Sequence, residues 1–180
     1  RSVALMKKLA LAALLAVTAC APFIPSSRWA GAPMFVVSNL DAAQLEGRWY
    51  EVASFPARFQ AGCYATVAEY TIRDDGLIGV RNTCRVDGQP GTVRQIEGTA
   101  RVVGPGQLQV RLDGVPFPAK YWVLDKSSDG RTLIVGTPTR QGGWVLRRDP
   151  RVTPEQLAEA RAVFARNGYD SAALQRTRQR

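Results

Sequence analysis

The sequence predicts an all-β protein in which eight strands form an up-and-down antiparallel barrel, with one α-helix near the C-terminus packed on its outside. Three observations lead to this fold class. From Arg48 onward, short runs of alternating apolar and polar residues are separated by turn signals at fairly regular intervals. The loops between these runs are short, which favours a series of hairpins over a Greek key. The capping signals and apolar spacing of a helix follow the last run.

The strands are delimited by turn residues. Asp74-Asp75-Gly76 and Asp113-Gly114 are typical of tight turns, because glycine tolerates positive φ and aspartate bonds to its own backbone. The 180 residues are enough for one domain with a sizeable core. We expect strands at residues 48–55, 63–72, 77–84, 92–102, 107–112, 119–125, 131–136 and 143–148.

The closing helix has signals at both ends. Thr153 is the expected N-cap, Pro154 takes the first helical position, and Gln156 completes a capping box. Gly168 is a natural left-handed cap at the other end. Three apolar residues recur at helical spacing and form one stripe, Leu157, Ala160 and Phe164. This stripe should pack on the outer wall of the barrel.

Composition excludes several classes of site. The formal net charge is +9, but the arginines are scattered and form no block, so we expect a solvated surface and no nucleic-acid partner. The chain has no histidine, which excludes a Ser-His-Asp triad, a Cys-His pair, HExxH zinc sites and proximal-His haem ligation. Three cysteines cannot form a four-thiolate metal site. We therefore expect no catalytic site, no metal and no cofactor.

The first 19 residues are expected to be a lipoprotein signal peptide that reads naturally from Met6. Two lysines precede the apolar run from Leu9 to Val17, and small residues follow it. That run is too short to cross a bilayer, which needs roughly 20 apolar residues. The export signal places the mature chain outside the cytoplasm.

The sequence "VTAC", which ends at Cys20, resembles a bacterial lipobox. This predicts that Cys20 becomes an acylated mature N-terminus and holds the protein to a membrane. Ala21 follows it, and the absence of aspartate there suggests the outer membrane, with the barrel facing the periplasm. Residues 20–39 are then lipid anchor and tether, and residues 40–180 are the barrel with its helix. Plain secretion, with Cys20 as a spare thiol, is the alternative.

Strand alternation predicts which side chains face the lumen. Small residues recur on this inner face and leave room for a cavity with an apolar lining, a few hydroxyls and one amide, which suits an acyl chain. A barrel filled by its own side chains is the alternative. The expected ligand-binding residues are Phe55, Thr66, Ala68, Tyr70, Val80, Asn82, Ile96, Val110, Leu112, Tyr121, Val123 and Val135.

Three motifs in order resemble those of the lipocalin family. Gly47 and Trp49 match the G-x-W motif of the first strand, and Asp125 matches the aspartate that follows an apolar sixth strand. Arg148 matches the arginine that ends the last strand, with Arg147 as the alternative. The second motif departs from the family's fuller Thr-Asp-Tyr form, so only its aspartate is carried over. Together with the lipobox, the chain looks like a bacterial outer-membrane lipocalin.

The motif residues are expected to build the container and not to touch the ligand. The Arg148 guanidinium can lie over the Trp49 indole in a cation–π contact that closes one end of the barrel. Gly47 lets the backbone cross that end without a Cβ.

Cys63 and Cys84 lie on consecutive predicted strands. If Ile72 faces Leu77, Cys84 faces Ala65, two residues from Cys63. A bulge, or Cys63 in the loop before the strand, would bring the two cysteines together, and the expected compartment is oxidising. We expect a disulfide; two free thiols are the alternative, and a reactive Cys63 is a distant third.

The resemblance implies a membrane-tethered protein that stores or transports single lipids, fatty acids such as palmitate or lysophospholipids, in cell-envelope maintenance. The alternatives are a lipocalin-like enzyme that acts on a small hydrophobic substrate through Tyr70, Tyr121 or a carboxylate, and a structural envelope lipoprotein. The sequence leaves a homodimer open, with Trp122 as an aromatic side chain that could serve its interface.

Overall fold

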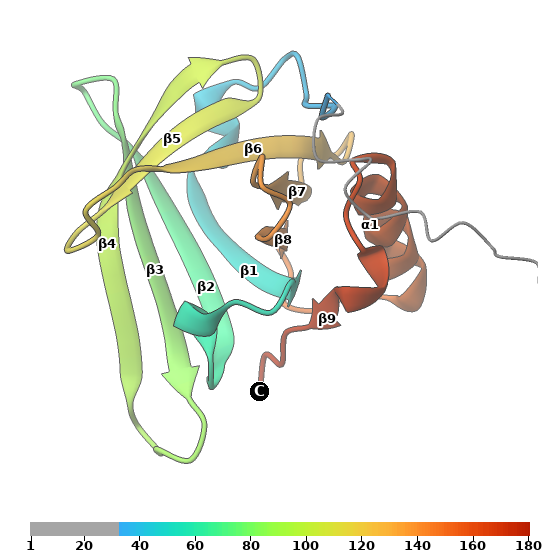
Figure 1. Ribbon diagram of the computed structural model, residues 1–180. Helices are drawn as coiled ribbons and strands as arrows, with labels where there is room; N and C mark the ends of the chain where they lie inside the picture. Colours follow the sequence, from blue (N-terminus) through green and yellow to red (C-terminus); the bar gives the residue numbers. More distant parts are fainter. Residues whose placement is uncertain (1–32) are drawn as a thin grey trace, which may run out of the picture.

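Eight antiparallel strands close into a barrel in the computed structural model, which describes residues 33–180 (Figure 1). The expected signal peptide, the expected anchor Cys20 and the tether up to residue 32 lie outside the described residues. The strands are β1 Gly47–Ser54, β2 Cys63–Ile72, β3 Ile78–Val86, β4 Val93–Gly104, β5 Gln107–Leu112, β6 Ala119–Lys126, β7 Thr132–Gly136 and β8 Gly143–Arg147.

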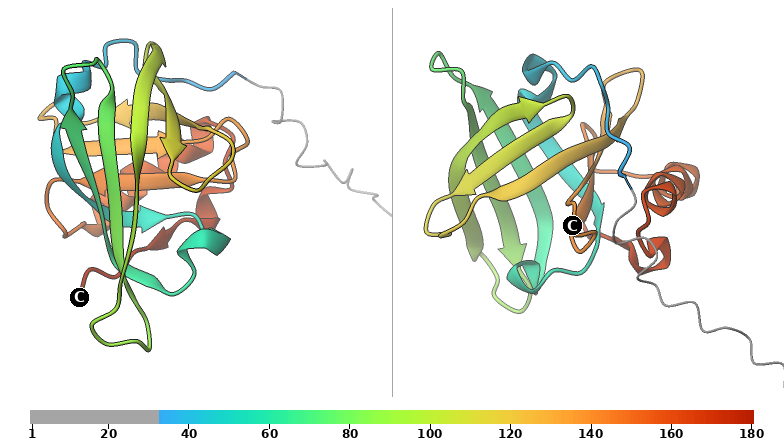
Figure 2. Two further views of the ribbon diagram at one scale, coloured as in Figure 1. Left: turned by 90° about the vertical axis from the view of Figure 1, so that its left-hand side faces the viewer. Right: turned by 45° about the horizontal axis from the view of Figure 1, so that its top comes forward.

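Each strand pairs with the next one in sequence, and β1 pairs with both β2 and β8, so the sheet closes on itself. The predicted up-and-down barrel is confirmed. In Figure 2 the long strands of residues 63–104 cross the shorter strands of residues 119–147 at a steep angle. Within the described part of the chain, no helix is both long and apolar enough to cross a membrane.

The predicted helix is confirmed as α1, Pro154–Arg166. Its capping box has both reciprocal bonds: Gln156 N donates to Thr153 Oγ1 over 3.2 Å, and Thr153 N donates to Gln156 Oε1 over 3.0 Å. Asn167 is the C-cap of the helix, and Gly168 after it adopts a φ of 79°. Figure 1 shows α1 lying against the outside of the barrel beside β7 and β8.

Two clusters of buried residues share the strands, because alternate side chains point to opposite faces. One faces the lumen, and we call it the lumen cluster: Leu45, Trp49, Ala68, Tyr70, Ile78, Val80, Ala100, Leu108, Val123, Leu133, Val135 and Leu146. The other lies under α1, and we call it the helix-side cluster: Val52, Ala53, Phe55, Leu124, Ile134, Val145, Val152, Ala160, Val163, Phe164, Tyr169 and Leu174. Trp122, which the sequence left as a candidate for a dimer interface, is half-buried against the helix-side cluster.

The chain has short elements that its sequence did not reveal. Within residues 33–180, three 3-10 turns precede β1, β2 and β9, and they are η2 Ala42–Leu45, η3 Arg58–Gln60 and η4 Ser171–Ala173. The ninth strand, β9 Gln175–Arg176, pairs with the last two residues of β1. A two-residue strand carries no alternation that could be recognised in a sequence. The pairing of β9 with β1 places the C-terminal segment along β1, next to the point where β1 and β2 separate.

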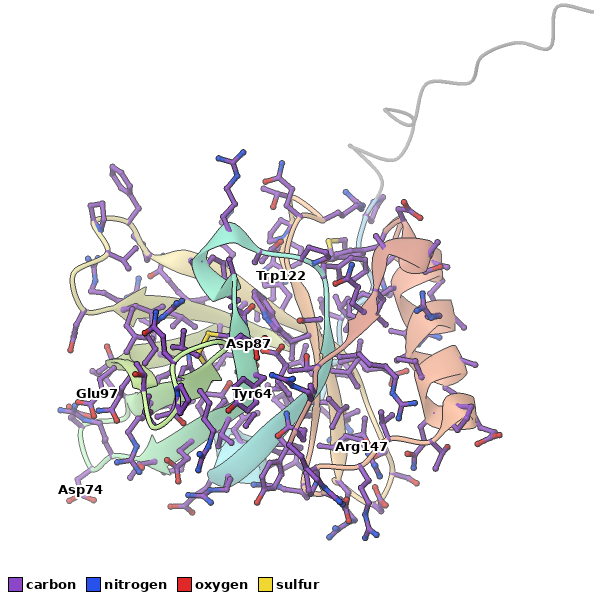
Figure 3. All side chains as sticks on the ribbon, turned by 90° about the horizontal axis from the view of Figure 1, so that it is seen from below. Tyr64, Asp74, Asp87, Glu97, Trp122 and Arg147 are labelled. Carbon is purple, nitrogen blue, oxygen red and sulfur yellow. A yellow bond between two sulfur atoms is a disulfide. The ribbon has the colours of Figure 1, made fainter. Side chains whose placement is uncertain are left out.

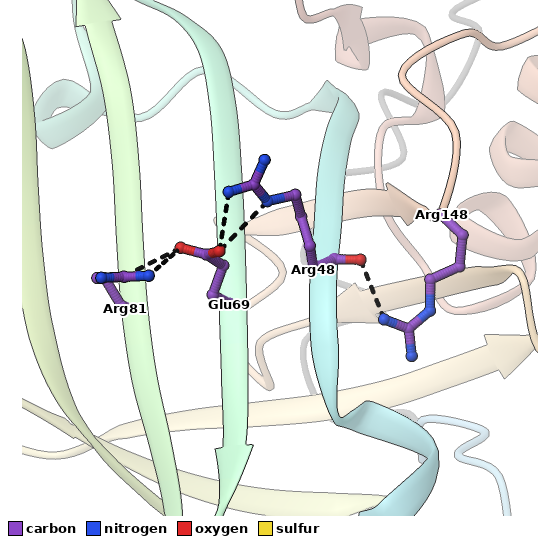
Figure 4. A network of polar contacts seen from close by, with 4 residues as sticks. All are labelled: Arg48, Glu69, Arg81 and Arg148. Carbon is purple, nitrogen blue, oxygen red and sulfur yellow. Dashed lines mark hydrogen bonds and ion pairs between the residues drawn. The ribbon is translucent and has the colours of Figure 1, made fainter.

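One end of the barrel is closed by the motif residues. The Arg148 guanidinium lies 3.7 Å from the centre of the Trp49 ring. It also donates to the carbonyl oxygens of Gln44 (3.1 Å), Glu46 (2.7 Å) and Arg48 (3.0 Å), and Figure 4 shows the last of these contacts. The backbone just before Trp49 is thereby tied to the end of β8.

Two further observations define this closed end. Gly47 has a φ of +92°, and a Cβ there would lie 3.2 Å from Arg148 Nη1, so both conformation and space favour glycine. Arg147 instead donates to Thr132 Oγ1 and to the carbonyl of Arg151, so Arg148 and not Arg147 covers the indole.

On the outer wall, Glu69 pairs with Arg48 and Arg81 and links three strands (Figure 4).

Asp125, the other motif residue, lies on the side of the helix. Its carboxylate pairs with Arg166 at the end of α1 over 2.7 Å and accepts from Lys126 N over 2.9 Å. Both carboxylate and guanidinium are partly exposed, so the pair adds at most about 1 kcal/mol. The pair links the C-terminal end of α1 to β6.

The predicted Cys63–Cys84 disulfide is confirmed, with the two Cα atoms 5.5 Å apart. The β2–β3 pairing shifts between Tyr64 and Val67, and Ala65 has a positive φ of 49°, so a bulge brings the cysteines together.

The hairpin register differs from the expected one by one residue. Ile72 pairs with Ile78, because Leu77 belongs to the turn: its carbonyl accepts from Arg73 N and its amide donates to Asp75 Oδ1.

Candidate functional site

The barrel encloses a cavity of about 890 Å³. Its lining includes residues of the loops 55–62, 113–118 and 137–142, so its mouth lies at the end opposite the Trp49–Arg148 closure. Cavities that take a drug-sized ligand typically measure about 300–1,000 Å³. The alternative of a barrel filled by its own side chains is therefore not what this chain forms.

The structure brings together nine of the twelve residues that the sequence assigned to the ligand. All nine line the cavity, and they come from β2, β3, β4, β5 and β6. Their contact with a ligand stays a prediction, but their common location is an observation. They are Thr66, Ala68, Tyr70, Val80, Asn82, Ile96, Val110, Leu112 and Tyr121.

Val123 and Val135 face inward as expected but do not line the cavity. Both are completely buried in the lumen cluster, together with Trp49. They pair with each other on β6 and β7. Their side chains fill the interior of the barrel and are part of its packing.

The assignment of Phe55 to the lumen is wrong. Its ring packs under the helix, 4.9 Å from the Phe164 ring and 5.1 Å from the Tyr169 ring between centroids. The β1–β8 pairing shifts between Glu51 and Ala53, and this bulge reverses the alternation along β1. Residues after the bulge that were expected to face inward therefore face α1.

Several lining residues were missed. Gln60 and Trp144 lie along one wall, Arg58 and Arg94 lie near the mouth, and Glu51 faces the cavity from β1. Glu51 could have been found, because it lies two residues after Trp49 and so shares its inward face. Its charge argued against that placement, while no comparable pattern marks the loop residues.

Glu51 is the only carboxylate among the described residues that line the cavity, and 4% of its surface is exposed. Gln60 Nε2 donates to its Oε2 and Thr177 Oγ1 donates to its Oε1, each over 2.7 Å. Trp144 Nε1 donates to Gln60 Oε1 over 3.0 Å, which holds the amide in place. Burial raises the pKa of Glu51, although these hydrogen bonds act in the opposite direction. Other carboxylates, such as Asp74 and Glu97, lie at the periphery in Figure 3.

Two tyrosine hydroxyls meet inside the barrel. Tyr70 on β2 and Tyr121 on β6 lie on opposite walls, and their hydroxyl oxygens are 2.9 Å apart. Burial raises the pKa of Tyr70 to about 12 and that of Tyr121 well above its ordinary value, so both are neutral. Tyr121 also stacks on Trp144, with centroids 6.2 Å apart. The pair is an uncharged polar bridge across a lumen that is lined mainly by apolar side chains.

The mouth combines positive charge with exposed aromatic rings. Arg58 and Arg94 line it, and Arg94 Nη1 donates to the carbonyl of Ala61 over 3.4 Å. Phe59 is 71% exposed and Phe117 is 79% exposed on two of the loops that frame the opening. An anionic head group at the mouth would therefore meet cations, while an apolar chain would enter the lumen.

The raised pKa of Glu51 predicts a pH dependence of stability. As pH rises past about 4.5, the ordinary value for this group, the unfolded chain releases this proton while the folded chain retains it. The stabilising contribution of protonated Glu51 is thus complete below that pH. It decreases as the pH rises and is fully lost once the pH exceeds the folded pKa. We expect Glu51→Gln to become progressively more stable than the parent over this range, by about 1.4 kcal/mol per unit of pKa elevation.

Denaturant unfolding of both proteins between pH 4 and pH 8 measures this difference. Glu69→Gln is a matched control of opposite sign, because hydrogen bonding to Arg48 lowers the pKa of Glu69. Parallel stability curves for the parent and Glu51→Gln would contradict the prediction.

Comparison with known proteins gives concordant results. Residues 40–179 match the family model described as a lipocalin-like domain. The chain is 35% identical to the outer membrane lipoprotein Blc of Escherichia coli K12, over 89% of this chain and 88% of that protein. It is 34% identical to temperature-induced lipocalin-1 of Arabidopsis thaliana (81% and 83% covered) and 30% identical to apolipoprotein D of Mus musculus (75% and 75%).

Solved structures agree on the fold. The cockroach allergen Per a 4 superposes with a TM-score of 0.66 at 15% identity, over 83% of this chain and 94% of that one. Lobster apocrustacyanin A1 gives a TM-score of 0.64 at 15% identity, over 82% and 93%. At this level of identity the likeness concerns the architecture of the barrel alone.

Proposed function

This chain belongs to the lipocalin family, and we propose that it stores or transports single lipids, fatty acids or lysophospholipids, in its barrel while it is tethered to a membrane. The fold and the relatives support the binding of a small hydrophobic ligand. The observation that carries the proposal is the cavity of about 890 Å³, which is open at one end and lined mainly by apolar side chains.

The distribution of charge supports a particular orientation of the lipid. Arg58 and Arg94 at the mouth suit a carboxylate or phosphate head group. The inner lining suits an acyl chain, because Val80, Val110 and Leu112 present hydrocarbon to it. The chain would thus be buried with the head group near solvent.

The tether and the location belong to the same proposal. Cys20 in its lipobox would be acylated and hold the barrel at the outer membrane, facing the periplasm. The E. coli relative, whose name states that it is an outer membrane lipoprotein, supports this location. A role in cell-envelope maintenance follows from a lipid carrier held at that site.

Titration of the delipidated protein with a fluorescent fatty acid tests the proposal. We expect saturable binding of one molecule per chain, and competition by palmitate and by lysophospholipid. When the protein is incubated with a stoichiometric amount of lipid, we expect to recover the lipid chemically unchanged. Formation of a product would favour the enzymatic alternative. Absence of saturable binding by protein whose circular dichroism shows an intact barrel would contradict the proposal.

A further inference from the structure

One hydroxyl in the cavity wall has no hydrogen-bond partner within the described part of the chain. Thr66 on β2 lines the cavity, only 9% of its surface is exposed, and its Oγ1 is the buried side-chain atom left unpaired. Leaving a buried hydroxyl unpaired costs free energy, so such groups are rare in folded proteins unless something else satisfies them. A polar group on a bound ligand is the partner that this location offers.

Glu51 lies beside Thr66 where two strands separate. The pairing of β1 with β2 ends at Tyr50 and Val67, and the next residues in the same register are Glu51 and Thr66. Gln179 Nε2 donates to the carbonyl oxygens of both, over 2.6 Å and 3.3 Å, and so bridges the gap. Both side chains line the cavity. We call Glu51 and Thr66 the seam subsite.

The C-terminal segment keeps the subsite in place. Thr177 N donates to the carbonyl of Val52 over 3.0 Å, and Ala65 N donates to the carbonyl of Arg178 over 2.7 Å. Arg178 also lies over the Tyr64 ring at 4.2 Å and pairs with Asp87. The segment thus joins β1 to β2 beyond the end of their ladder, and the subsite is built on fixed backbone.

The chemistry of the subsite selects among polar groups. Both Glu51 oxygens already accept hydrogen bonds. An anion placed in this buried subsite would lose its hydration without gaining an opposite charge, so its binding there would be opposed. The lining cations Arg58 and Arg94 that would attract an anion are at the mouth. Thr66 Oγ1 can donate one hydrogen bond and accept others, which matches an alcohol.

We propose that the seam subsite binds an uncharged hydroxyl group of the lipid through Thr66 Oγ1, so that the protein prefers lipids that carry an alcohol within the cavity. This inference rests on the proposed function and narrows its class of ligand. The alcohol can come from a hydroxylated acyl chain or from the glycerol of a monoacylglycerol.

Competition titrations compare palmitate, a positional series of monohydroxylated palmitates, and 1-monopalmitoylglycerol. At least one of the alcohols should bind about threefold to tenfold more tightly than palmitate, as one neutral hydrogen bond allows. A gain confined to one hydroxylated palmitate identifies the acyl chain as the source; a gain confined to the glyceride identifies the glycerol. Either result supports the proposal.

Thr66→Val removes the hydroxyl and keeps the shape of the side chain. In this variant the ratio of the palmitate and alcohol dissociation constants should fall to about one. Thr71→Val makes the same change on an exposed position of the same strand, outside the cavity, and should keep the parent ratio. Without ligand, Thr66→Val should melt at the same or a higher temperature than the parent, because an unpaired buried hydroxyl is removed.

Four results would overturn the inference. Alcohols that bind no more tightly than palmitate, or a preference that persists in Thr66→Val, would contradict the subsite while leaving the proposed function intact. Hexadecylamine that binds more tightly than every alcohol would assign the subsite to a cation paired with Glu51. Failure of every probe to bind would contradict the proposed function, and this inference with it.

Discussion

Lipid binding is expected to fall by at least about 100-fold when Val110 is replaced by tryptophan, because an indole would occupy the space that the acyl chain needs. Val110 lies on β5, is half-buried, and faces the cavity between Ala100 and Ala119, its partners on the neighbouring strands. Overpacking of a filled core costs roughly 1–3 kcal/mol, but here the added ring enters open volume. The barrel should therefore stay folded.

The matched control for this variant is Arg111→Trp. Arg111 is the next residue, lies exposed on the outer face of the same strand, and does not line the cavity. Titration with the fluorescent fatty acid, together with a thermal melt of each protein, separates loss of binding from loss of fold. Undiminished binding by folded Val110→Trp would show that the ligand does not occupy this lumen.

Trp49→Ala is expected to lower the free energy of unfolding by about 3–5 kcal/mol. The indole is completely buried at the closed end, donates to the Leu45 carbonyl over 2.7 Å, and carries the Arg148 guanidinium on its face. Removal of the indole leaves a cavity, and it also takes away the aromatic face on which the Arg148 guanidinium lies. Because the free energy of unfolding of a whole domain is only about 5–15 kcal/mol, this one substitution removes a large part of the stability of the protein.

Denaturant unfolding measures this loss, and Trp122→Ala is its control. Trp122 is the same side chain half-buried on the outside of the barrel, so its truncation should cost less. The fraction of Trp49→Ala that remains folded should bind lipid with the parent affinity, since this end is remote from the mouth. A loss no larger than that of Trp122→Ala would contradict the role of the closed end.

The sequence was informative wherever one local rule determined the outcome. The alternation of β5 and β2, the capping box at Thr153 and the glycine at residue 168 each depend on neighbouring residues, and the structure has all three. The nine lining residues that were found follow from the same alternation.

The misplaced residues depend on backbone irregularities that no residue type announces. The bulge of β1 between Glu51 and Ala53 turns Phe55 toward the helix, and the bulge near Ala65 brings Cys63 to Cys84. Ala65 adopts positive φ without being glycine, and its amide donates to the Arg178 carbonyl of the C-terminal segment, a contact that its residue type does not predict.

The inward position of Glu51 was missed for a different reason. Glu51 shares the inward parity of Trp49, but a carboxylate facing a lumen conflicts with the apolar pattern used to assign that face. Its burial depends on Gln60, Thr177 and Gln179, which come from a loop and from the C-terminal segment. The contacts of Thr177 and Gln179 with Glu51 span 126 and 128 residues of sequence, and the Gln60 contact depends on how the loop after β1 folds back. A local pattern reveals neither kind of contact.

Native mass spectrometry of the protein purified from its own host tests most directly whether the barrel holds one lipid. The protein should carry a single noncovalent mass increment of one lipid per chain, which is lost on denaturation, whereas an acyl group on Cys20 would remain. The increment should be absent from Val110→Trp and present in Arg111→Trp. A folded parent protein that carries no lipid and takes up none when fatty acid or lysophospholipid is added would contradict lipid binding by this barrel.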